Sequence, residues 1–244
     1  MNAVIDLLQS HRSIRKFKDV PLQPEHIDAI VASAQMASTS SNVQAYSIIA
    51  VTDPEKKREL ARLAGNQAYV EHSGLFLVFC ADLYRLREAT ELNGETFHQN
   101  TESFIVATVD ATLAAQNAAV AAESLGFGIV YIGGIRSAPE DVSRLLQLPE
   151  LVYPVFGMCI GVPDQEPSAR PRLPKQAVLH YNGYQADSVR QQIETYDDTM
   201  QEYYRTRTGG KTVTTWSRGI ADKFRQPVRA HIRSFLEARG FKLE

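Results

Sequence analysis

The longest helical pattern in the chain runs over residues 102–124, with the sequence ESFIVATVDATLAAQNAAVAAES. Alanine and other small residues lie on several faces of this helix rather than on a single stripe. A helix that is apolar on more than one side has to be covered on more than one side. We therefore expect it to be buried in the fold, with its own symmetry mate as a candidate neighbour.

The remaining hydrophobic pattern predicts more helices than strands. Helical spacing predicts helices over residues 3–10, 24–36, from 54 onward, 139–146, 187–206 and 226–239. Apolar runs predict buried strands over residues 46–52, 74–81, 129–132 and 152–161. No GxGxxG follows any of these strands and no GxxxxGK[ST] occurs, which disfavours a Rossmann domain and a P-loop. A bound nucleotide would therefore have to be held by side chains.

Composition sets outer limits on the class of protein. A chain of 244 residues, 44% hydrophobic and 22% charged, can bury a substantial core. We see no apolar window of the length that a membrane span requires and no basic leader at the start, so we predict a cytoplasmic protein without a membrane partner. Cys80 and Cys159 both lie in apolar runs, which favours buried reduced thiols over a disulfide or a metal site.

Charge is distributed unevenly along the chain. Residues 205–242 carry ten lysines and arginines against two acidic residues, although the whole chain has a formal net charge of −2. This basic tail is consistent with a nucleic-acid patch, with a surface that docks on another copy, or with a site for a phosphorylated small molecule. Nucleic-acid binding is the weakest alternative, because the whole chain is slightly acidic and contains no recognised nucleic-acid motif.

The segment His11-Arg12-Ser13-Ile14-Arg15 places three cation-capable side chains and a hydroxyl within five residues. Arginine offers a rigid fork of donors that suits phosphate oxygens, and serine adds a neutral donor at short range. The alternative is a solvated basic surface.

Other segments could complete a binding site. Ser38-Thr39-Ser40-Ser41 is a run of hydroxyls, or simply a loop that ends a helix. Arg170-Pro171-Arg172 sets two guanidinium groups on a stiff scaffold, or is an exposed linker. Tyr131-Ile132-Gly133-Gly134 would let backbone approach a flat ligand, or forms a turn.

Taken in order, these motifs are similar to those of a known family. HRSIRKF, SxSSxxQ, Gln67, VDATLAAQNAAVAAESLGFGIVYIGGIR, RPRLP and YYRTRTGG resemble the oxygen-insensitive NADPH nitroreductase and NADPH–flavin oxidoreductase group of the nitroreductase superfamily. The resemblance implies an α+β fold with a mixed central sheet flanked by helices. It also implies a domain-exchanged homodimer with two FMN molecules at the interface. Residues 1–183 would form the FMN-binding core, and residues 184–244 a helical excursion that contacts the partner subunit and NADPH.

The same resemblance assigns site residues, and no metal site. Those that would bind FMN are His11, Arg12, Ser13, Arg15, Thr39, Ser41, Gln67, Tyr131, Ile132, Gly133, Gly134, Arg170 and Arg172. Those that would contact NADPH or the acceptor are Ser40, Asn42, Glu102, Arg207, Lys211 and Arg229. Arg12 would hold the phosphate and Arg15 the pyrimidine edge of the ring, while Arg207 would grip the 2′-phosphate of NADPH.

The implied activity is hydride transfer from NADPH to the flavin, followed by delivery of two electrons to a nitroaromatic, a quinone or free flavin. Such ping-pong chemistry needs no protein nucleophile or general base. The alternatives are a non-catalytic flavin-binding or regulatory protein, a flavin-dependent dehalogenase or fragmentation branch of the superfamily, and an interaction domain without a cofactor.

Overall fold

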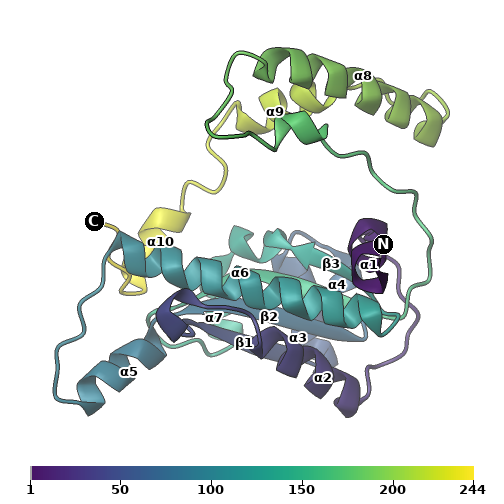
Figure 1. The fold of residues 1–244 in the computed structure, drawn as a ribbon. Helices are drawn as coiled ribbons and strands as arrows, with labels where there is room; N and C mark the ends of the chain where they lie inside the picture. The colour runs from purple at the N-terminus through teal and green to yellow at the C-terminus, as the bar shows by residue number, and fades with distance from the viewer. Residues whose placement is uncertain (1) are drawn as a thin grey trace. The chain divides into compact units, whose positions relative to one another are not determined.

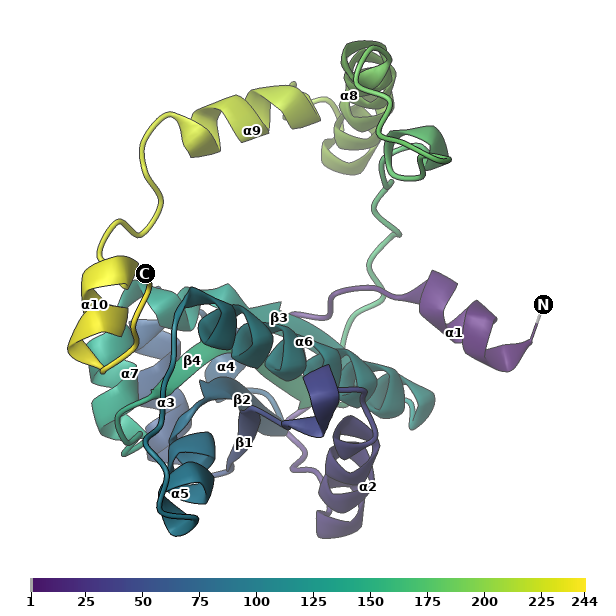
Figure 2. The ribbon, with the colours of Figure 1, turned by 60° about the vertical axis from the view of Figure 1, so that its left-hand side comes forward.

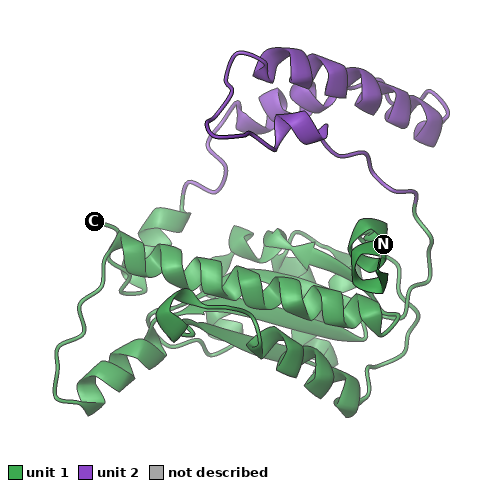
Figure 3. Cartoon of the chain, in the orientation of Figure 1, with its two compact units in different colours: residues 1–167, 231–244 green, residues 168–230 purple. Residues whose placement is uncertain are grey.

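The computed structural model describes residues 2–244, and the chain divides into two compact units (Figure 3). Unit 1 contains residues 1–167 together with residues 231–244, and unit 2 contains residues 168–230. The chain thus leaves unit 1 and returns to it at the C-terminus. The predicted functional boundary at residue 183 does not coincide with the boundaries of these two units, and it stays a prediction.

A four-stranded sheet forms the centre of unit 1 (Figure 1). Its strands are β1 (Tyr46–Val51), β2 (Leu75–Asp82), β3 (Gly128–Ile132) and β4 (Val152–Gly161). They lie in the order β1-β2-β4-β3 with every neighbouring pair antiparallel. The parallel component of the sheet is a single bridge between Ser13 and Ile129 at the β3 edge. The four strands predicted from apolar runs are confirmed.

Strand β2 explains why the sheet is covered on both faces. All eight of its residues, LFLVFCAD, are buried. Because successive side chains of a strand point to opposite faces, such a continuous apolar run needs a core on each side. Leu75 and Leu77 belong to one core cluster and Phe76 and Val78 to the other.

Helices supply both covers (Figure 2). One cluster joins the sheet to α2 (Pro24–Gln35), α6 (Thr101–Ser124) and α10 (Ile232–Ala238). The other joins it to α3 (Pro54–Leu63), α4 (Ala68–Glu71) and α7 (Pro139–Leu145). Cys80 and Cys159 are free, buried thiols, as expected from their apolar surroundings.

Helix α6 is the long alanine-rich helix predicted to be buried, and it crosses one face of the sheet (Figure 1). Its alanines form the buried face; these are Ala107, Ala111, Ala114, Ala115, Ala118, Ala119 and Ala122. Side chains of this size let the helix approach the sheet and α2 closely. On another face Ile105, Val109 and Leu113 remain between 43% and 49% exposed.

The expectation that no segment could span a membrane needs one correction. Helix α6 is long and apolar enough to do so by length and composition. Its alanine face, however, packs on the sheet as part of the core of unit 1. The apolar composition of this helix is therefore accounted for by packing within the domain.

Strand β4 contains a proline although it lies between two partners. The register against β2 shifts so that Phe79 faces Phe156 while Cys80 faces Pro154. Residue Val155 is thus the extra residue of a bulge. Since β3 pairs with β4 only as far as Gly157, Pro154 lies outside the β3–β4 ladder and removes no hydrogen bond from it.

Unit 2 and the adjoining C-terminus depart from the predicted helices. Helix α8 (Val189–Thr208) confirms the prediction for residues 187–206. The predicted helix over 226–239 is wrong in extent, since α10 covers only Ile232–Ala238. Helix α9 (Trp216–Phe224) lies between these two predicted helices and was not predicted; the Thr215 side chain caps its start by accepting the Arg218 N–H. Helices α1 (Ala3–Ser10) and α5 (Tyr84–Leu92) complete the set of longer helices, and α5 was not predicted.

Candidate functional site

The segment of residues 11–15 is fastened to the β3 edge of the sheet. The backbone N–H of Ile14 donates to the carbonyl oxygen of Ile129 at 2.8 Å, next to the parallel bridge at Ser13. The Ile14 side chain is buried and fills the space beside Gly128, where an added Cβ would lie 2.5 Å from Cγ1 of Ile14. The backbone between Arg12 and Arg15 is therefore fixed by the core.

Arg12 and Arg15 themselves point away from that core. Both side chains are exposed. Among residues 2–244 neither guanidinium makes a hydrogen bond or an ion pair. By contrast, most of the arginines that lie in α-helices pair with a neighbouring carboxylate. Two guanidinium groups on a rigid strand-like segment without internal partners are suited to bind an external anion.

His11 is already engaged by the protein. Its Nδ1 lies 2.6 Å from Oε1 of Glu123, near the end of α6, and both side chains are partly buried. This contact leaves Nε2 as the ring nitrogen available to a ligand. Beside the pair lies a cavity of about 390 Å³, whose lining includes His11, Arg12 and Gly128.

Gln67 and Gly134 are in direct contact, although they come from different loops. An added Cβ at Gly134 would lie 2.5 Å from Nε2 of Gln67 and 2.3 Å from the carbonyl oxygen of Ala64. The Gln67 amide donates to the same carbonyl at 2.7 Å and accepts from the Tyr69 hydroxyl at 2.6 Å. Close packing, rather than turn geometry, therefore requires glycine at 134. The glutamine is held rigidly, with one N–H left for a ligand.

Tyr131 stands at the end of β3, beside a hollow of about 420 Å³. Its ring packs edge-on against Phe156 with centroids 5.3 Å apart, and its hydroxyl lies 3.4 Å from Oε1 of Gln116 on α6. Gly133 lines the same hollow, and Ile132 between them is buried. Burial, with a smaller effect from the Glu123 charge, raises the pKa of Tyr131 above its usual range, so the phenol is neutral at ordinary pH.

The hydroxyl run forms a tight turn between α2 and β1. Ser40–Asn42 form a short 3-10 helix (η1) in which Ser41 has a φ of 47°. Thr39 is partly buried, while Ser40, Ser41 and Asn42 are exposed. The backbone N–H groups of Ser40 and Ala45 both donate to the buried carboxylate of Asp110 on α6. The turn is therefore attached to the central helix at both ends.

Glu102 lies in the first turn of α6, where its charge favours the helix dipole, and its side chain is exposed.

Unit 2 holds the other arginines assigned from the sequence. Arg170 donates to the Tyr204 hydroxyl at 3.0 Å, and Arg207 donates to the Tyr203 hydroxyl at 3.0 Å. Each guanidinium also lies within 6 Å of the same ring. Two successive tyrosines of α8 thus orient the two arginines.

The other assigned residues of unit 2 are Arg172, which precedes α8, Lys211, which follows α8, and Arg229, which follows α9. Arg172 is exposed, and Lys211 is exposed just after Gly209, which ends α8 with a φ of 60°. Arg229 is partly buried and has a φ of 53°.

Several of these residues are brought together within unit 1. The 11–15 segment meets β3, Gln67 meets Gly134, and residues 40–45 meet α6. The sequence reasoning missed Asp110 and Glu123. Asp110 had a detectable signal, because it is the only acidic residue between Glu102 and Glu123 in an otherwise alanine-rich helix.

Comparison with known proteins identifies the class to which this fold and site belong. The sequence profile of the nitroreductase family matches residues 8–162, and that of the nitroreductase family C-terminal domain matches residues 170–244. The chain therefore belongs to the nitroreductase family.

Individual relatives cover nearly the whole chain. An "FMN reductase (NADPH)" of Bacillus subtilis (strain 168) is 52% identical over 246 residues, which is 99% of each sequence. The structure of the nitroreductase NfrA1 from B. subtilis is similar with a TM-score of 0.95 and 51% identity, covering 98% of both chains. The structure of the NADPH:FMN oxidoreductase from Vibrio harveyi complexed with NAD+ has a TM-score of 0.89 and 43% identity, covering 98% of this chain and 99% of that one. The sequence-based resemblance is thereby confirmed at the level of the family and the fold.

Proposed function

We propose that the protein is an FMN-dependent NADPH oxidoreductase that delivers two electrons at a time to nitroaromatics, quinones or free flavin. The observation that carries this proposal is the pair Arg12 and Arg15, two guanidinium groups without a partner among residues 2–244, on a backbone anchored to β3. Relatives named for FMN and NADPH chemistry support it along the full length of the chain.

The donors of unit 1 fit FMN chemically. The cofactor has a phosphate, a polyhydroxylated chain and a ring with hydrogen-bonding edges. Arg12 and Arg15 supply charge without internal competition, and Ser13 supplies a hydroxyl beside them. Gln67 keeps one amide N–H free next to Gly134. This set can bind the phosphate, the chain and the ring edge of one molecule.

When bound, FMN supplies the redox chemistry by accepting a hydride from NADPH and then passing two electrons to the acceptor in a ping-pong sequence. The protein binds and orients the reactants. Arg12 would hold the phosphate, and Arg170 and Arg172 stay candidate FMN ligands on the family resemblance. Arg15 would hold positive charge against the pyrimidine edge, which favours the reduced cofactor electrostatically.

The ring would lie against the end of β3. Tyr131 and Gly133 line a hollow there, with the Tyr131 ring packed on Phe156, and the buried Ile132 and Gly134 would contribute through their backbone. His11 would use its free Nε2, and the hydroxyls of Thr39 and Ser41 would complete the flavin contacts. Since no side chain has to act as nucleophile or general base, a wide range of acceptors can use one open ring face.

NADPH would be selected by the basic residues of unit 2. Arg207 is held by Tyr203 on the last turns of α8, and Lys211 follows on the Gly209-Gly210 connection. A 2′-phosphate is doubly charged near neutral pH, so these two cations would favour NADPH over NADH. Ser40, Asn42, Glu102 and Arg229 would lie around the nicotinamide and acceptor.

We further propose a homodimer in which residues 184–244 contact the partner subunit. The exposed stripe of Ile105, Val109 and Leu113 on α6 supports it, because apolar side chains repeated at every fourth residue of a helix usually have a partner. A cytoplasmic location remains a prediction.

Anaerobic reduction of the purified protein tests the proposed function. We expect a yellow preparation that is bleached rapidly by NADPH and more slowly by NADH, and that is reoxidised on mixing with nitrofurazone, a quinone or free FMN. A yellow protein that NADPH does not bleach would identify a non-catalytic flavin carrier. A colourless preparation that releases no flavin on denaturation would refute the proposal.

A further inference from the structure

A fully buried carboxylate lies at the centre of unit 1 without a cationic partner. Asp110 of α6 is 0% exposed, and among residues 2–244 it forms no ion pair. Its Oδ1 accepts the backbone N–H of Ser40 at 3.1 Å, and its Oδ2 accepts the backbone N–H of Ala45 at 3.0 Å. Both oxygens are thus committed to the two ends of one turn.

That turn has a conformation that residues with a Cβ rarely adopt. Ser41, Asn42 and Gln44 have φ values of 47°, 58° and 52°. Three left-handed residues within four positions persist only where surrounding contacts fix the backbone. The two hydrogen bonds to Asp110 supply such contacts, because they hold Ser40 and Ala45 on the same side chain.

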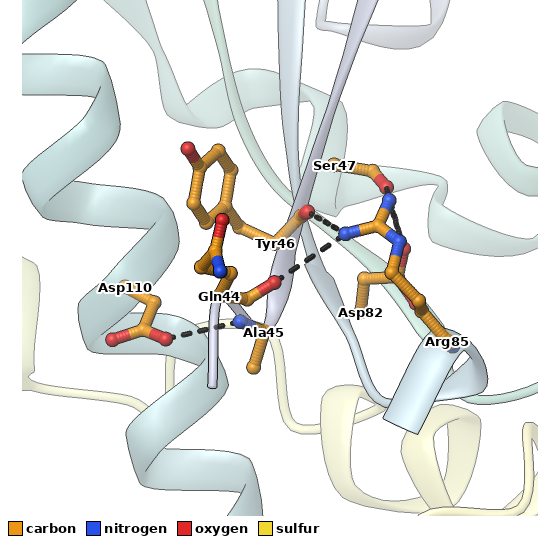
Figure 4. A network of polar contacts seen from close by, with 7 residues as sticks. All are labelled: Gln44, Ala45, Tyr46, Ser47, Asp82, Arg85 and Asp110. Carbon is orange, nitrogen blue, oxygen red and sulfur yellow. Dashed lines mark hydrogen bonds and ion pairs between the residues drawn. The ribbon is translucent and has the colours of Figure 1, made fainter. Parts of the chain in front are cut away.

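A second group holds the turn where it enters β1 (Figure 4). The Arg85 guanidinium donates to the carbonyl oxygen of Tyr46 at 3.0 Å and to that of Gln44 at 3.4 Å. Arg85 is itself held by Asp82 at 3.4 Å. The Asp110 carboxylate therefore binds N–H groups of the turn, and the Arg85 guanidinium binds its carbonyl groups.

We propose that Asp110 is a positioning residue of the flavin site, which sets the backbone of residues 40–45 and thereby the hydroxyls of Thr39 and Ser41. The inference rests on the proposed function, in which these hydroxyls contact FMN and Ser40 and Asn42 face the nicotinamide or acceptor. Burying a carboxylate costs free energy that an apolar residue in a core would not cost. At this position the carboxylate supplies the two hydrogen-bond acceptors that hold the strained turn at both ends.

The substitution Asp110→Asn separates positioning from packing. Asparagine keeps the size of the side chain, but only one of its two terminal atoms can accept an N–H, so one end of the turn is released. We expect the dissociation constant of FMN, measured by flavin fluorescence on dilution of the holoenzyme, to rise by about tenfold, as for loss of one hydrogen bond to a charged group. The KM for the acceptor should rise as well, while kcat falls less. Amide hydrogen exchange at Ser40 and Ala45 should become faster.

Ala118→Gly is the matched control, because it weakens the same helix at a buried position away from the turn. It should lower the melting temperature and leave the FMN dissociation constant and the acceptor KM unchanged. If Asp110→Asn lowers the melting temperature as the control does, with FMN affinity, KM and exchange at Ser40 and Ala45 unaltered, the carboxylate only stabilises the fold and the inference is overturned.

A second variant covers the case in which Asp110→Asn does not fold. Arg85→Ala removes an exposed side chain that grips the same turn from outside. It should raise the FMN dissociation constant about threefold, in line with a partly exposed contact. An Arg85→Ala protein with wild-type FMN affinity and exchange would then overturn the inference. A wild-type protein that binds no flavin or is not reduced by NADPH refutes the proposed function instead, so the two failures are distinguishable.

Discussion

Ile14 occupies the space that a side chain at residue 128 would need, since an ideal Cβ on Gly128 would lie 2.5 Å from Cγ1 and 2.8 Å from Cβ of Ile14. The contact couples the 11–15 segment to the first residue of β3, and with it the backbone that carries Arg12 and Arg15. The position of two proposed cofactor ligands thus depends on the absence of one methyl group.

We therefore expect Gly128→Ala to destabilise the protein by about 1–3 kcal/mol, the usual cost of overpacking. FMN affinity should fall with it, because the segment has to move away from β3. Thermal unfolding and FMN titration measure the two effects. Gly219→Ala is the control: apart from its chain neighbours and the nearby backbone of its own helix, no atom lies within 4 Å of its added Cβ, and alanine in the middle of α9 should raise stability by about 0.5–1 kcal/mol. A Gly128→Ala protein as stable as wild type would show that the Ile14 side chain can move aside, and the prediction would be wrong.

Arg12 and Arg15 should differ in what they control. Arg12→Ala should weaken FMN binding by about ten- to a hundredfold, the loss of a charge-assisted contact to phosphate. Arg15→Ala should instead lower the midpoint potential of the bound flavin, because a positive charge beside the ring edge favours the reduced form. Dialysis against limiting FMN and anaerobic redox titration separate the two. If both variants lose only FMN affinity, the division of roles is wrong.

The fold was predictable where local pattern and tertiary packing agree. The run of residues 75–81 is apolar throughout and lies between Gly74 and Asp82, a pattern typical of a strand that is covered on both faces. The start of α9 at Trp216 carries one local signal, the Thr215 cap, but it is also held by Asp197 of α8, twenty residues earlier than Ser217, whose N–H it accepts at 2.8 Å. That second contact is tertiary and leaves no periodic signal.

The residues of the candidate site also differ in how far the sequence alone reveals their role. Arg12 and Arg15 were identifiable from residue type and spacing alone, and their lack of internal partners agrees with a binding role. Asp110 stood out only as an isolated acidic residue in an alanine-rich helix, and neither its role nor that of Glu123 could be predicted, because each acts through a contact with a residue about 70 to 110 positions away. Sequence order cannot indicate which turn a helix carboxylate will hold.

Selectivity for NADPH should depend on Arg207. Its replacement by alanine should lower the ratio of kcat/KM for NADPH to that for NADH by about tenfold, since only NADPH has the 2′-phosphate. Steady-state kinetics with both donors give the ratio. Arg205→Ala is a matched control on the same helix, because the Arg205 guanidinium is occupied by Glu202 at 2.7 Å. An unchanged ratio for Arg207→Ala would assign the phosphate to another residue.

Acid should loosen the α8–α9 pair through Asp197. Burial alone would raise the pKa of this carboxyl, but hydrogen bonds from the Ser217 hydroxyl and N–H and from Thr215 outweigh it, so the pKa lies below its ordinary value. A carboxyl whose pKa is depressed by folding adds stability at pH values above its unfolded pKa of about 3.9 and loses this contribution as the pH falls through its folded pKa.

Trp216, the single tryptophan, packs on Tyr196 with ring centroids 5.7 Å apart, so its fluorescence reports on the α8–α9 pair. Between pH 5 and pH 2 the unfolding midpoint seen by Trp216 should fall in wild type. In Asp197→Asn it should start lower and change less, whereas Asp198→Asn, at the exposed neighbouring position, should follow the wild-type curve. Parallel curves for wild type and Asp197→Asn would mean that other carboxyls govern the acid transition.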